Sequence, residues 1–309
     1  MPLAANPMFS VISPVYRAES LLDELVLRLG RSLATLSASY EIILVDDGSP
    51  DNSWGKIQQH AAQDARIRGV RLSRNFGQHH AITAGLDQAR GEWVIVMDCD
   101  LQDRPEEIPA FYYRAQQGFD VVLASRAGRQ DAWVKKSVSK LFYALLSYLT
   151  GAPQDPSVAN FGLYHSRVIT AVRELRESIR YFPTMIRWVG FRQTTIAVEH
   201  AAEGRPSTYS FARRLRLATD VIVSYSDKPL RLTAYLGLLL ASGAFLLGLI
   251  TLFRFAVGQI TVPGYTSLLI AISFFSGLII LVLGIVGLYV GKTFESVRSR
   301  PLYVVESTT

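Results

Sequence analysis

Aspartates that could bind a ligand follow two apolar, strand-like segments of the sequence. In the first, Asp46 and Asp47 stand before the turn-forming Gly48. In the second, Asp98 and Asp100 are two residues apart. If the chain stays extended there, both of these side chains point to the same side, and a divalent cation could lie between them.

The Asp98–Asp100 pair has the chemistry of a magnesium site. Magnesium keeps several waters and usually takes one or two protein carboxylates together with substrate phosphates, so two aspartates are enough. A single Asp-x-Asp match is more often a solvated surface pair. Its place at the end of one apolar segment, with Asp46 and Asp47 at the end of another, favours the cation site.

Short β-rich segments alternate with segments of helical spacing in the first part of the chain. The strand-like segments are 9–13, 41–45, 69–72, 93–97 and 120–124, and the helical ones are 20–36, 78–89 and 105–117. This alternation indicates an α/β fold with a mainly parallel sheet covered on both faces. Because ligands of such sheets bind beyond the carboxyl ends of the strands, we expect both aspartate pairs at one sheet edge.

Other kinds of site are disfavoured. The single cysteine, Cys99, excludes an intramolecular disulfide framework and a Cys-rich zinc site. No Gly-x-Gly-x-x-Gly follows a strand-like segment, which disfavours a dinucleotide-binding site. The 5 histidines are adjacent or scattered, so we expect no histidine metal site. Basic residues form no stripe with interleaved aromatics on the N-terminal part, so we expect no nucleic-acid partner.

The apolar residues are concentrated near the C-terminal end. The sequence carries no charge from Leu232 to Phe253 or from Ser267 to Val290. Each segment is long enough to cross a bilayer, which needs about 20 apolar residues. Buried core helices are usually shorter and carry a polar stripe, so two transmembrane helices are the favoured interpretation.

Basic residues flank the two predicted spans. The net charge is +6, and the loop between the spans offers only Arg254, whereas the outer flanks carry Arg213, Arg214, Arg216, Lys228, Arg231, Lys292, Arg298 and Arg300. The positive-inside bias places both termini and the large N-terminal part in the cytoplasm. The first residues have neither a basic start nor an apolar run of signal-peptide length, so export is not expected.

These patterns predict four parts along the chain. They are a cytoplasmic domain over 1–206, a basic amphipathic segment over 207–231, a two-helix membrane domain over 232–291 and a cytoplasmic tail over 292–309. Residues 209–226 are amphipathic enough to lie on the membrane or to join subunits, and we favour the membrane. Homo-oligomerisation stays open.

An ordered set of motifs resembles a known family. The motifs are PVY at 14–16, VDDGSPD at 45–51, LSRNFGQHHAITAGLDQARG at 72–91, MDCDLQDRPEEIP at 97–109, SRAGRQDAWVKKSVSK at 125–140 and DKPLRL at 227–232. They are similar to family 2 glycosyltransferases of the polyprenyl-phosphate type. That group includes bactoprenol glucosyltransferases, undecaprenyl-phosphate aminoarabinose transferases and, more distantly, dolichol-phosphate mannose synthases.

The resemblance implies a GT-A fold and an activity. The enzyme would move a sugar from a nucleotide sugar, a UDP-sugar by our interpretation, to polyprenyl (undecaprenyl) phosphate with inversion of the anomeric centre. It would be a multi-pass protein of the bacterial inner membrane, with Mg²⁺ or Mn²⁺ as cofactor, and would serve modification of cell-envelope glycans such as lipopolysaccharide or O-antigen. Which sugar is moved is not readable from the sequence.

The resemblance also assigns roles to residues. For the nucleotide sugar these are Pro14, Tyr16, Glu19, Asp46, Asp47, Asp98 and Arg205. The metal would be held by Asp98, Asp100 and Gln102. The catalytic positions are Asp100, Arg126 and Asn160. Candidates for the lipid phosphate are Arg129, Lys135, Lys136 and Lys140, for which a solvated basic face near anionic lipid is an equally good explanation.

Three departures from the family pattern bear on the mechanism. The Gly-Asp-Phe or Gly-Asp-Tyr stretch, whose Asp is often assigned a catalytic role, is here Ala-Asn-Phe with Asn160 at the Asp position. The Ser-Lys-Tyr loop has Thr208 in place of Lys, and Arg17 replaces the Asn after PVY. An amide cannot accept a proton from the acceptor, but a phosphate monoester has a second pKa of about 6 and arrives ionised.

Two alternatives stay open at this point. A processive polysaccharide synthase is disfavoured because its Gln-x-x-Arg-Trp signature is matched only over 184–188, without the Gln, and because two spans are few for a polymer channel. The other alternative is a degenerate, membrane-anchored protein that binds nucleotide sugars without turning them over, as the residues Asn160 and Thr208 suggest.

Overall fold

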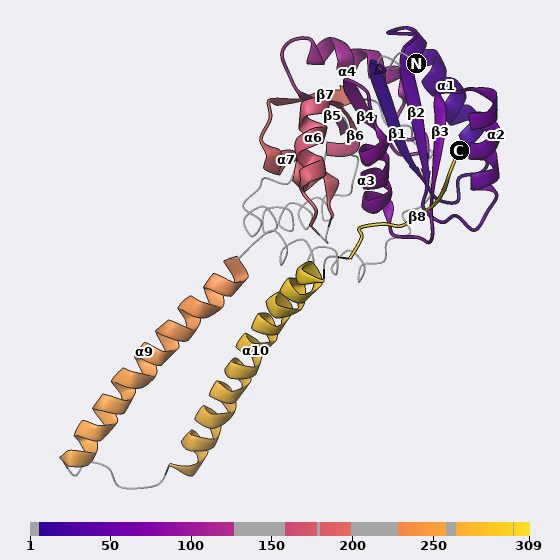
Figure 1. Ribbon diagram of the computed structural model, residues 1–309. Coiled ribbons are helices and arrows are strands. Elements are labelled where there is room, and N and C mark those ends of the chain that lie inside the picture. The colour runs from indigo at the N-terminus through magenta and orange to yellow at the C-terminus, as the bar shows by residue number, and fades with distance from the viewer. Residues whose placement is uncertain (1–5, 127–157, 178–179, 199–227, 258–263, 299) are drawn as a thin grey trace. The chain divides into compact units, whose positions relative to one another are not determined.

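The computed structural model describes residues 6–126, 158–177, 180–198, 228–257, 264–298 and 300–309 (Figure 1). The chain forms two compact units. The first contains the sheet with its covering helices and includes the last ten positions, from Arg300 to Thr309, and the second contains two long helices.

Eight strands within the described residues form one sheet, in the order β7-β5-β6-β4-β1-β2-β3-β8. Strand β1 is parallel to both of its neighbours, β2 and β4, and β3 is parallel to β2. Strand β6 runs antiparallel between β4 and β5, and β8 runs antiparallel beside β3. The strands are β1 (Phe9–Val15), β2 (Tyr40–Asp46), β3 (Ile67–Leu72), β4 (Trp93–Val96), β5 (Val121–Arg126), β6 (Val158–His165), β7 (Gln193–Val198) and β8 (Val305–Thr308).

Helices cover both faces of the sheet because successive residues of the central strands point to opposite sides. Val11 of β1 belongs to the core under α1, α2 and α4, whereas Ile12 belongs to the core under α3, α6 and α7. The helices are α1 (Leu22–Ala34), α2 (Ser53–Gln63), α3 (Gln78–Gln88), the 3₁₀ helix η1 (Pro105–Glu107), α4 (Ile108–Ala115), α6 (Ser166–Glu174) and α7 (Phe182–Val189).

The predicted mostly parallel α/β sheet is confirmed. The expected strand-like segments are β1 to β5, and the expected helical segments contain α1, α3 and α4. Three strands, β6, β7 and β8, were not anticipated. Strand β6 separates β5 from β4, and β8 adds an edge strand from the segment expected to be a tail.

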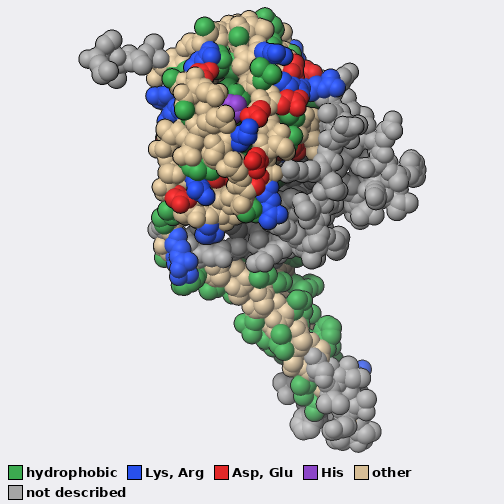
Figure 2. Space-filling model, turned by 90° about the vertical axis from the view of Figure 1, so that its right-hand side faces the viewer, with side chains coloured by type: hydrophobic (Ala, Val, Ile, Leu, Met, Phe, Trp, Pro, Cys, Tyr) green, Lys and Arg blue, Asp and Glu red, His purple; other side chains and the backbone are tan. Residues whose placement is uncertain are grey.

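The second unit consists of α9 (Lys228–Ala256) and α10 (Tyr265–Val297). Within the described residues, one segment is long and apolar enough to cross a membrane, Phe274–Gly291 of α10, with a mean hydropathy of 2.4 and no buried part. The apolar stretch found in α9 is shorter, Leu230–Leu240. Two transmembrane helices are therefore not confirmed. Figure 2 shows hydrophobic side chains along the visible part of the helices, and charged ones on the sheet unit.

The chain returns to the sheet after α10. Strand β8 pairs with β3, with Val70 opposite Thr308 and Arg71 opposite Ser307. The backbone N–H of Thr309 donates to the carbonyl of Gly69 at 3.1 Å, and the N–H of Gly69 donates to Oγ1 of Thr309 at 2.8 Å. The segment after the long helices is therefore part of the same folded sheet as the N-terminal strands.

Candidate active site

Both aspartate pairs lie at one edge of the sheet. Strands β4, β1 and β2 are adjacent and parallel, so their carboxyl ends meet at the same edge. Strands β2 and β3 follow β1 on one side of it, and the next strand in the chain, β4, lies on the other side of β1. Such a reversal of strand order opens the crevice in which α/β sheets bind ligands.

Asp46 is the last residue of β2 and is fully buried. Its Oδ1 accepts the backbone N–H of Ser49 at 3.1 Å, and its Oδ2 lies 3.5 Å from Nε of Arg71 on β3. Burial raises the pKa of Asp46, while hydrogen bonds from Ser49 and the charge of Arg71 act in the opposite direction. Asp46 is therefore a buried carboxyl group behind the sheet edge, with Arg71 3.5 Å away.

Asp47 holds the loop between β3 and α3. Its two carboxylate oxygens accept the backbone N–H groups of Phe76 at 2.7 Å and Gly77 at 2.9 Å. Burial raises the pKa of Asp47, and these two hydrogen bonds lower it in part. A Cβ on Gly48 would come within 2.6 Å of the carbonyl carbon of Arg74, so the turn and the loop are in close contact.

The second aspartate pair follows β4 and contacts two neighbouring elements. Oδ1 of Asp98 accepts a hydrogen bond from Nε2 of Gln78, at the start of α3, at 2.6 Å. Oδ1 of Asp100 accepts the backbone N–H of Gln102 at 3.1 Å. Between them, the sulfur of Cys99 accepts a hydrogen bond from the backbone N–H of Tyr16. Burial raises the pKa of the Cys99 thiol to about 12. Cys99 thus joins the ends of β1 and β4 and stays protonated.

The donor set at this loop fits a hard divalent cation. Asp98 and Asp100 are half-buried carboxylates, and Gln102 lies two residues further on. Within the ranges that the structure describes, there is no group of three or more His, Cys, Asp or Glu that could enclose a metal ion. Two carboxylates fit a cation that completes its shell with water and phosphate oxygens.

The two other catalytic positions lie at the same edge. β4 and β6 pair with Val96 opposite Gly162, and the same register carried past β4 puts the half-buried Asn160 level with Asp98. Arg126 ends β5, which is antiparallel to β6 and so points the same way as β4. The remaining candidates lie outside the described residues, namely Arg129, Lys135, Lys136, Lys140 and Arg205.

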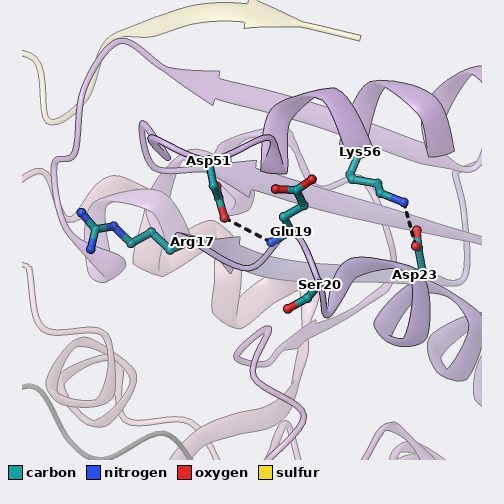
Figure 3. A pocket seen from close by; sticks show the side chains of 6 residues that line it. All are labelled: Arg17, Glu19, Ser20, Asp23, Asp51 and Lys56. Atoms are coloured by element: carbon teal, nitrogen blue, oxygen red, sulfur yellow. Dashed lines mark hydrogen bonds and ion pairs between the residues drawn. The ribbon is translucent and has the colours of Figure 1, made fainter.

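Beside the end of β1 lies a polar pocket of about 400 Å³ (Figure 3). The Glu19 carboxylate accepts the backbone N–H of Asn52 at 3.2 Å, and the Glu19 N–H donates to Asp51 at 3.3 Å. Arg17 extends away from these carboxylates in Figure 3. The ring of Tyr16 is 41% exposed, whereas Pro14 is buried within β1. Of these predicted contacts, Tyr16 and Glu19 present accessible surface to a ligand.

Sequence reasoning missed Arg71 and Gln78. Arg71 stands opposite Asp46 in the β2–β3 register, and Gln78 contacts Asp98. The sequence did contain a signal for Arg71. It is a charged residue inside a predicted strand, and such a residue is seldom buried without a carboxylate partner. Gln78 belongs to a motif whose partner becomes visible only when α3 is placed against β4.

The comparisons with known proteins decide the family. The model of "Glycosyl transferase family 2" matches residues 10–172. An undecaprenyl-phosphate 4-deoxy-4-formamido-L-arabinose transferase from Proteus mirabilis (strain HI4320) is 37% identical over 301 residues, covering 96% of this chain and 92% of that protein. The chain belongs to glycosyltransferase family 2.

Other relatives of this glycosyltransferase agree with that assignment. The uncharacterized glycosyltransferase YkcC from Bacillus subtilis (strain 168) is 34% identical over 310 residues, covering 99% of this chain and 95% of that protein. The crystal structure of glucosyl-3-phosphoglycerate synthase from Mycobacterium tuberculosis with Mn²⁺, UDP and phosphoglyceric acid aligns with a TM-score of 0.51 at 18% identity, covering 71% of this chain and 78% of that one. The expected family is confirmed, and the fold resembles GT-A structures.

His79 of this glycosyltransferase makes folding stability depend on pH. Burial, and next the positive charges of His80 and Arg180, lower its pKa from 6.5 to about 4. As the pH falls below 6.5, the unfolded chain binds a proton that the folded chain refuses, so stability is complete above pH 6.5 and decreases towards pH 4. We expect a loss of about 2 kcal/mol by pH 5 that His79→Phe abolishes. Thermal unfolding between pH 7.5 and 4.5 measures it, and equal slopes for the two proteins would contradict it.

Proposed function

We propose that this glycosyltransferase transfers a sugar from a UDP-sugar to a polyprenyl phosphate, with inversion, at the cytoplasmic face of a bacterial inner membrane. The observation that carries the proposal is the 37% identity, over nearly the whole of both chains, to a protein named as an undecaprenyl-phosphate transferase. The match extends through the long apolar helices as well as the sheet. The domain boundaries expected from the sequence are part of the same proposal, except that 300–309 belongs to the sheet unit and not to a separate tail.

At the strand ends, Asp98 and Asp100 would hold Mg²⁺ or Mn²⁺, with Gln102 nearby. The bound cation supplies charge stabilisation of the leaving diphosphate, in the way that metal ions act on phosphoryl oxygens. The protein's own part is to fix this loop. Gln78 orients Asp98 through the 2.6 Å hydrogen bond from its Nε2 to Oδ1 of Asp98. The hydrogen bond from the backbone of Tyr16 to Cys99 links the loop to the end of β1.

The nucleoside would bind beside the end of β1. The exposed ring of Tyr16 offers a face on which a base can stack. Glu19 and Asp51 line the adjacent polar pocket, where carboxylates can accept hydrogen bonds from ribose hydroxyls. Asp46 is fully buried, so we assign it an indirect role through Arg71.

The acceptor explains why Asn160 is tolerated. A lipid phosphate with a second pKa of about 6 is already ionised at neutral pH and needs no general base. The main task of the protein is then to bring the charged oxygen in line with the anomeric carbon. Asn160, level with Asp98 in the sheet register, can orient a phosphate oxygen through its amide N–H.

Substituting Asn160 by aspartate tests this account of the acceptor. We expect Asn160→Asp to leave kcat within about threefold of the wild type, because no proton is removed from the nucleophile in the transfer step. The pH profile of kcat should rise through the acceptor's second pKa of about 6 in both proteins and stay flat above it. A gain of tenfold or more in Asn160→Asp would show that a base had been missing.

The C-terminal strand supports a membrane hairpin with two crossings. α9 follows the sheet unit in the chain, and β8 rejoins the same sheet after α10. A segment whose two flanks belong to one folded sheet crosses a bilayer an even number of times. If Phe274–Gly291 crosses, a second crossing is needed. We assign it to α9, whose exposed Leu238, Leu246 and Phe253 suit that environment.

Cysteine labelling tests the two crossings. Cys99 is the only native cysteine, so a Cys99→Ser background gives single-cysteine proteins. In intact cells, we expect Gln259→Cys, between α9 and α10, to react with a membrane-impermeant maleimide, and Ser307→Cys to react only after the membrane is opened. Equal reaction of both positions in intact cells would contradict the topology.

The activity itself is tested with purified full-length protein, undecaprenyl phosphate, Mn²⁺ and a panel of UDP-sugars. We expect one donor to give UDP together with a lipid product heavier by one sugar residue. A ladder of lengthening products would support a processive synthase instead. Absence of UDP release and of lipid product with every donor would refute the proposed function.

A further inference from the structure

The C-terminal strand brings an acidic side chain close to Arg71, which neighbours the buried Asp46. Oε2 of Glu306 lies 3.3 Å from Nε of Arg71, and the same Nε lies 3.5 Å from Oδ2 of Asp46. We infer that Glu306 is a positioning residue for donor binding, which holds Arg71 beside Asp46 at the edge where the nucleotide binds. This inference rests on the proposed function, because it assumes that a nucleotide sugar occupies that edge.

A β-bulge directs Glu306 to this position. The β3–β8 register passes from Arg71 opposite Ser307 to Leu72 opposite Val305, so Glu306 is the additional residue. Bulges re-aim a side chain and are frequent beside active sites. In a regular strand, Glu306 would precede Ser307 and point to the opposite face of the sheet from the residue paired with Arg71. The bulge is what places its carboxylate beside Arg71.

Strand β8 is held on both sides of Glu306. Thr309 exchanges two hydrogen bonds with Gly69, and the N–H of Ser73 donates to the carbonyl of Val304 at 2.9 Å. Further along, the hydroxyl of Tyr303 donates to Asp87 at 2.7 Å. The carboxylate of Glu306 is thus presented from a fixed backbone rather than from a free tail.

The charges explain what Glu306 adds. Asp46 is completely buried, and a buried carboxylate depends strongly on a nearby cation. The Arg71 side chain is 34% exposed and Glu306 is 51% exposed, so Arg71 lies between a buried and a solvated carboxylate. Nε makes no hydrogen bond to either carboxylate, so the two contacts are electrostatic. The two negative charges keep the guanidinium near the site edge, where a polar or anionic part of the donor can bind its terminal nitrogens.

The test is calorimetric binding of UDP, with Mn²⁺, to the full-length protein in detergent, together with donor KM and kcat. We expect Glu306→Gln to weaken UDP binding and to raise the donor KM by about threefold, because the pair is partly solvated. Its kcat should stay unchanged. Arg71→Gln should weaken UDP binding by about tenfold, and the double variant should bind no more weakly than Arg71→Gln alone.

Glu174→Gln, which removes an exposed carboxylate at the end of α6, is the matched control and should bind UDP as the wild type does. Melting temperatures check that every variant is folded. Wild-type affinity in Glu306→Gln, or additive losses in the double variant, would overturn the inference alone. Failure of the wild type to bind UDP would instead overturn the proposed function on which it rests.

Discussion

Replacing Asp100 by alanine lowers kcat by about a thousandfold, if the cation held there supplies about 4 kcal/mol of transition-state stabilisation. The physical reason lies in the loop after β4. Asp98 and Asp100 are the carboxylates beside the predicted diphosphate, and the described residues nearby provide no third acidic ligand to compensate. The measurement is UDP release by the purified protein at saturating donor and acceptor, over a range of Mn²⁺ concentrations.

Asp64→Ala is the control for loss of an aspartate. Asp64 caps the end of α2, at the opposite edge of the sheet, and pairs with Arg66 at 2.7 Å. We expect this variant to keep wild-type kcat. An Asp100→Ala protein that retained more than a tenth of wild-type turnover would mean that the cation is held elsewhere or is not needed.

Replacing Gly48 by alanine is expected to destabilise the fold by about 3 kcal/mol, combining a strained left-handed backbone with overlap in a packed region. Gly48 has φ of +64°, and a Cβ there would lie 2.6 Å from the carbonyl carbon of Arg74 and 2.7 Å from the backbone nitrogen of Asn75. The aspartate turn and the β3–α3 loop would be pushed apart, so activity should fall as well. Denaturant unfolding of the full-length protein measures the loss.

Gly190→Ala separates the two contributions. Gly190 has a similar φ of +74°, but the nearest atom to an added Cβ is 3.9 Å away. Only backbone strain is then introduced, and we expect a loss of about 1 kcal/mol with activity retained. If the two substitutions cost the same, close contact between the turn and the loop is not what Gly48 provides.

Local sequence patterns predicted the central sheet because β1, β2 and β4 are apolar runs followed by turns and amphipathic helices. The place of the aspartates followed from a general rule, because the carboxyl ends of adjacent parallel strands lie at the same edge of a sheet. Asp46 and Asp98 are found at that edge. The roles given to these residues stay predictions. The candidates for the lipid phosphate, such as Lys135 and Lys136, lie outside the described residues and stay predictions too.

The unanticipated parts depend on contacts between distant segments. Strand β8 is short, and its pattern of Val, Glu, Ser and Thr has no local feature that distinguishes it from an exposed tail. It becomes a strand because the edge of β3 offers unpaired backbone groups, more than 200 positions earlier in the chain. Arg71 and Glu306 could therefore not be recognised as neighbours of Asp46 from spacing alone.

The most direct test of the central claim, an ionised lipid phosphate attacking the sugar of a nucleotide donor, is the linkage and anomeric configuration of the lipid product. Nuclear magnetic resonance of the product made by the purified protein from UDP-sugar and undecaprenyl phosphate gives both. We expect a single sugar joined through its anomeric carbon to the lipid phosphate, with configuration opposite to that of the donor. A product with retained configuration, or release of free sugar with UDP and no lipid product, would contradict the account.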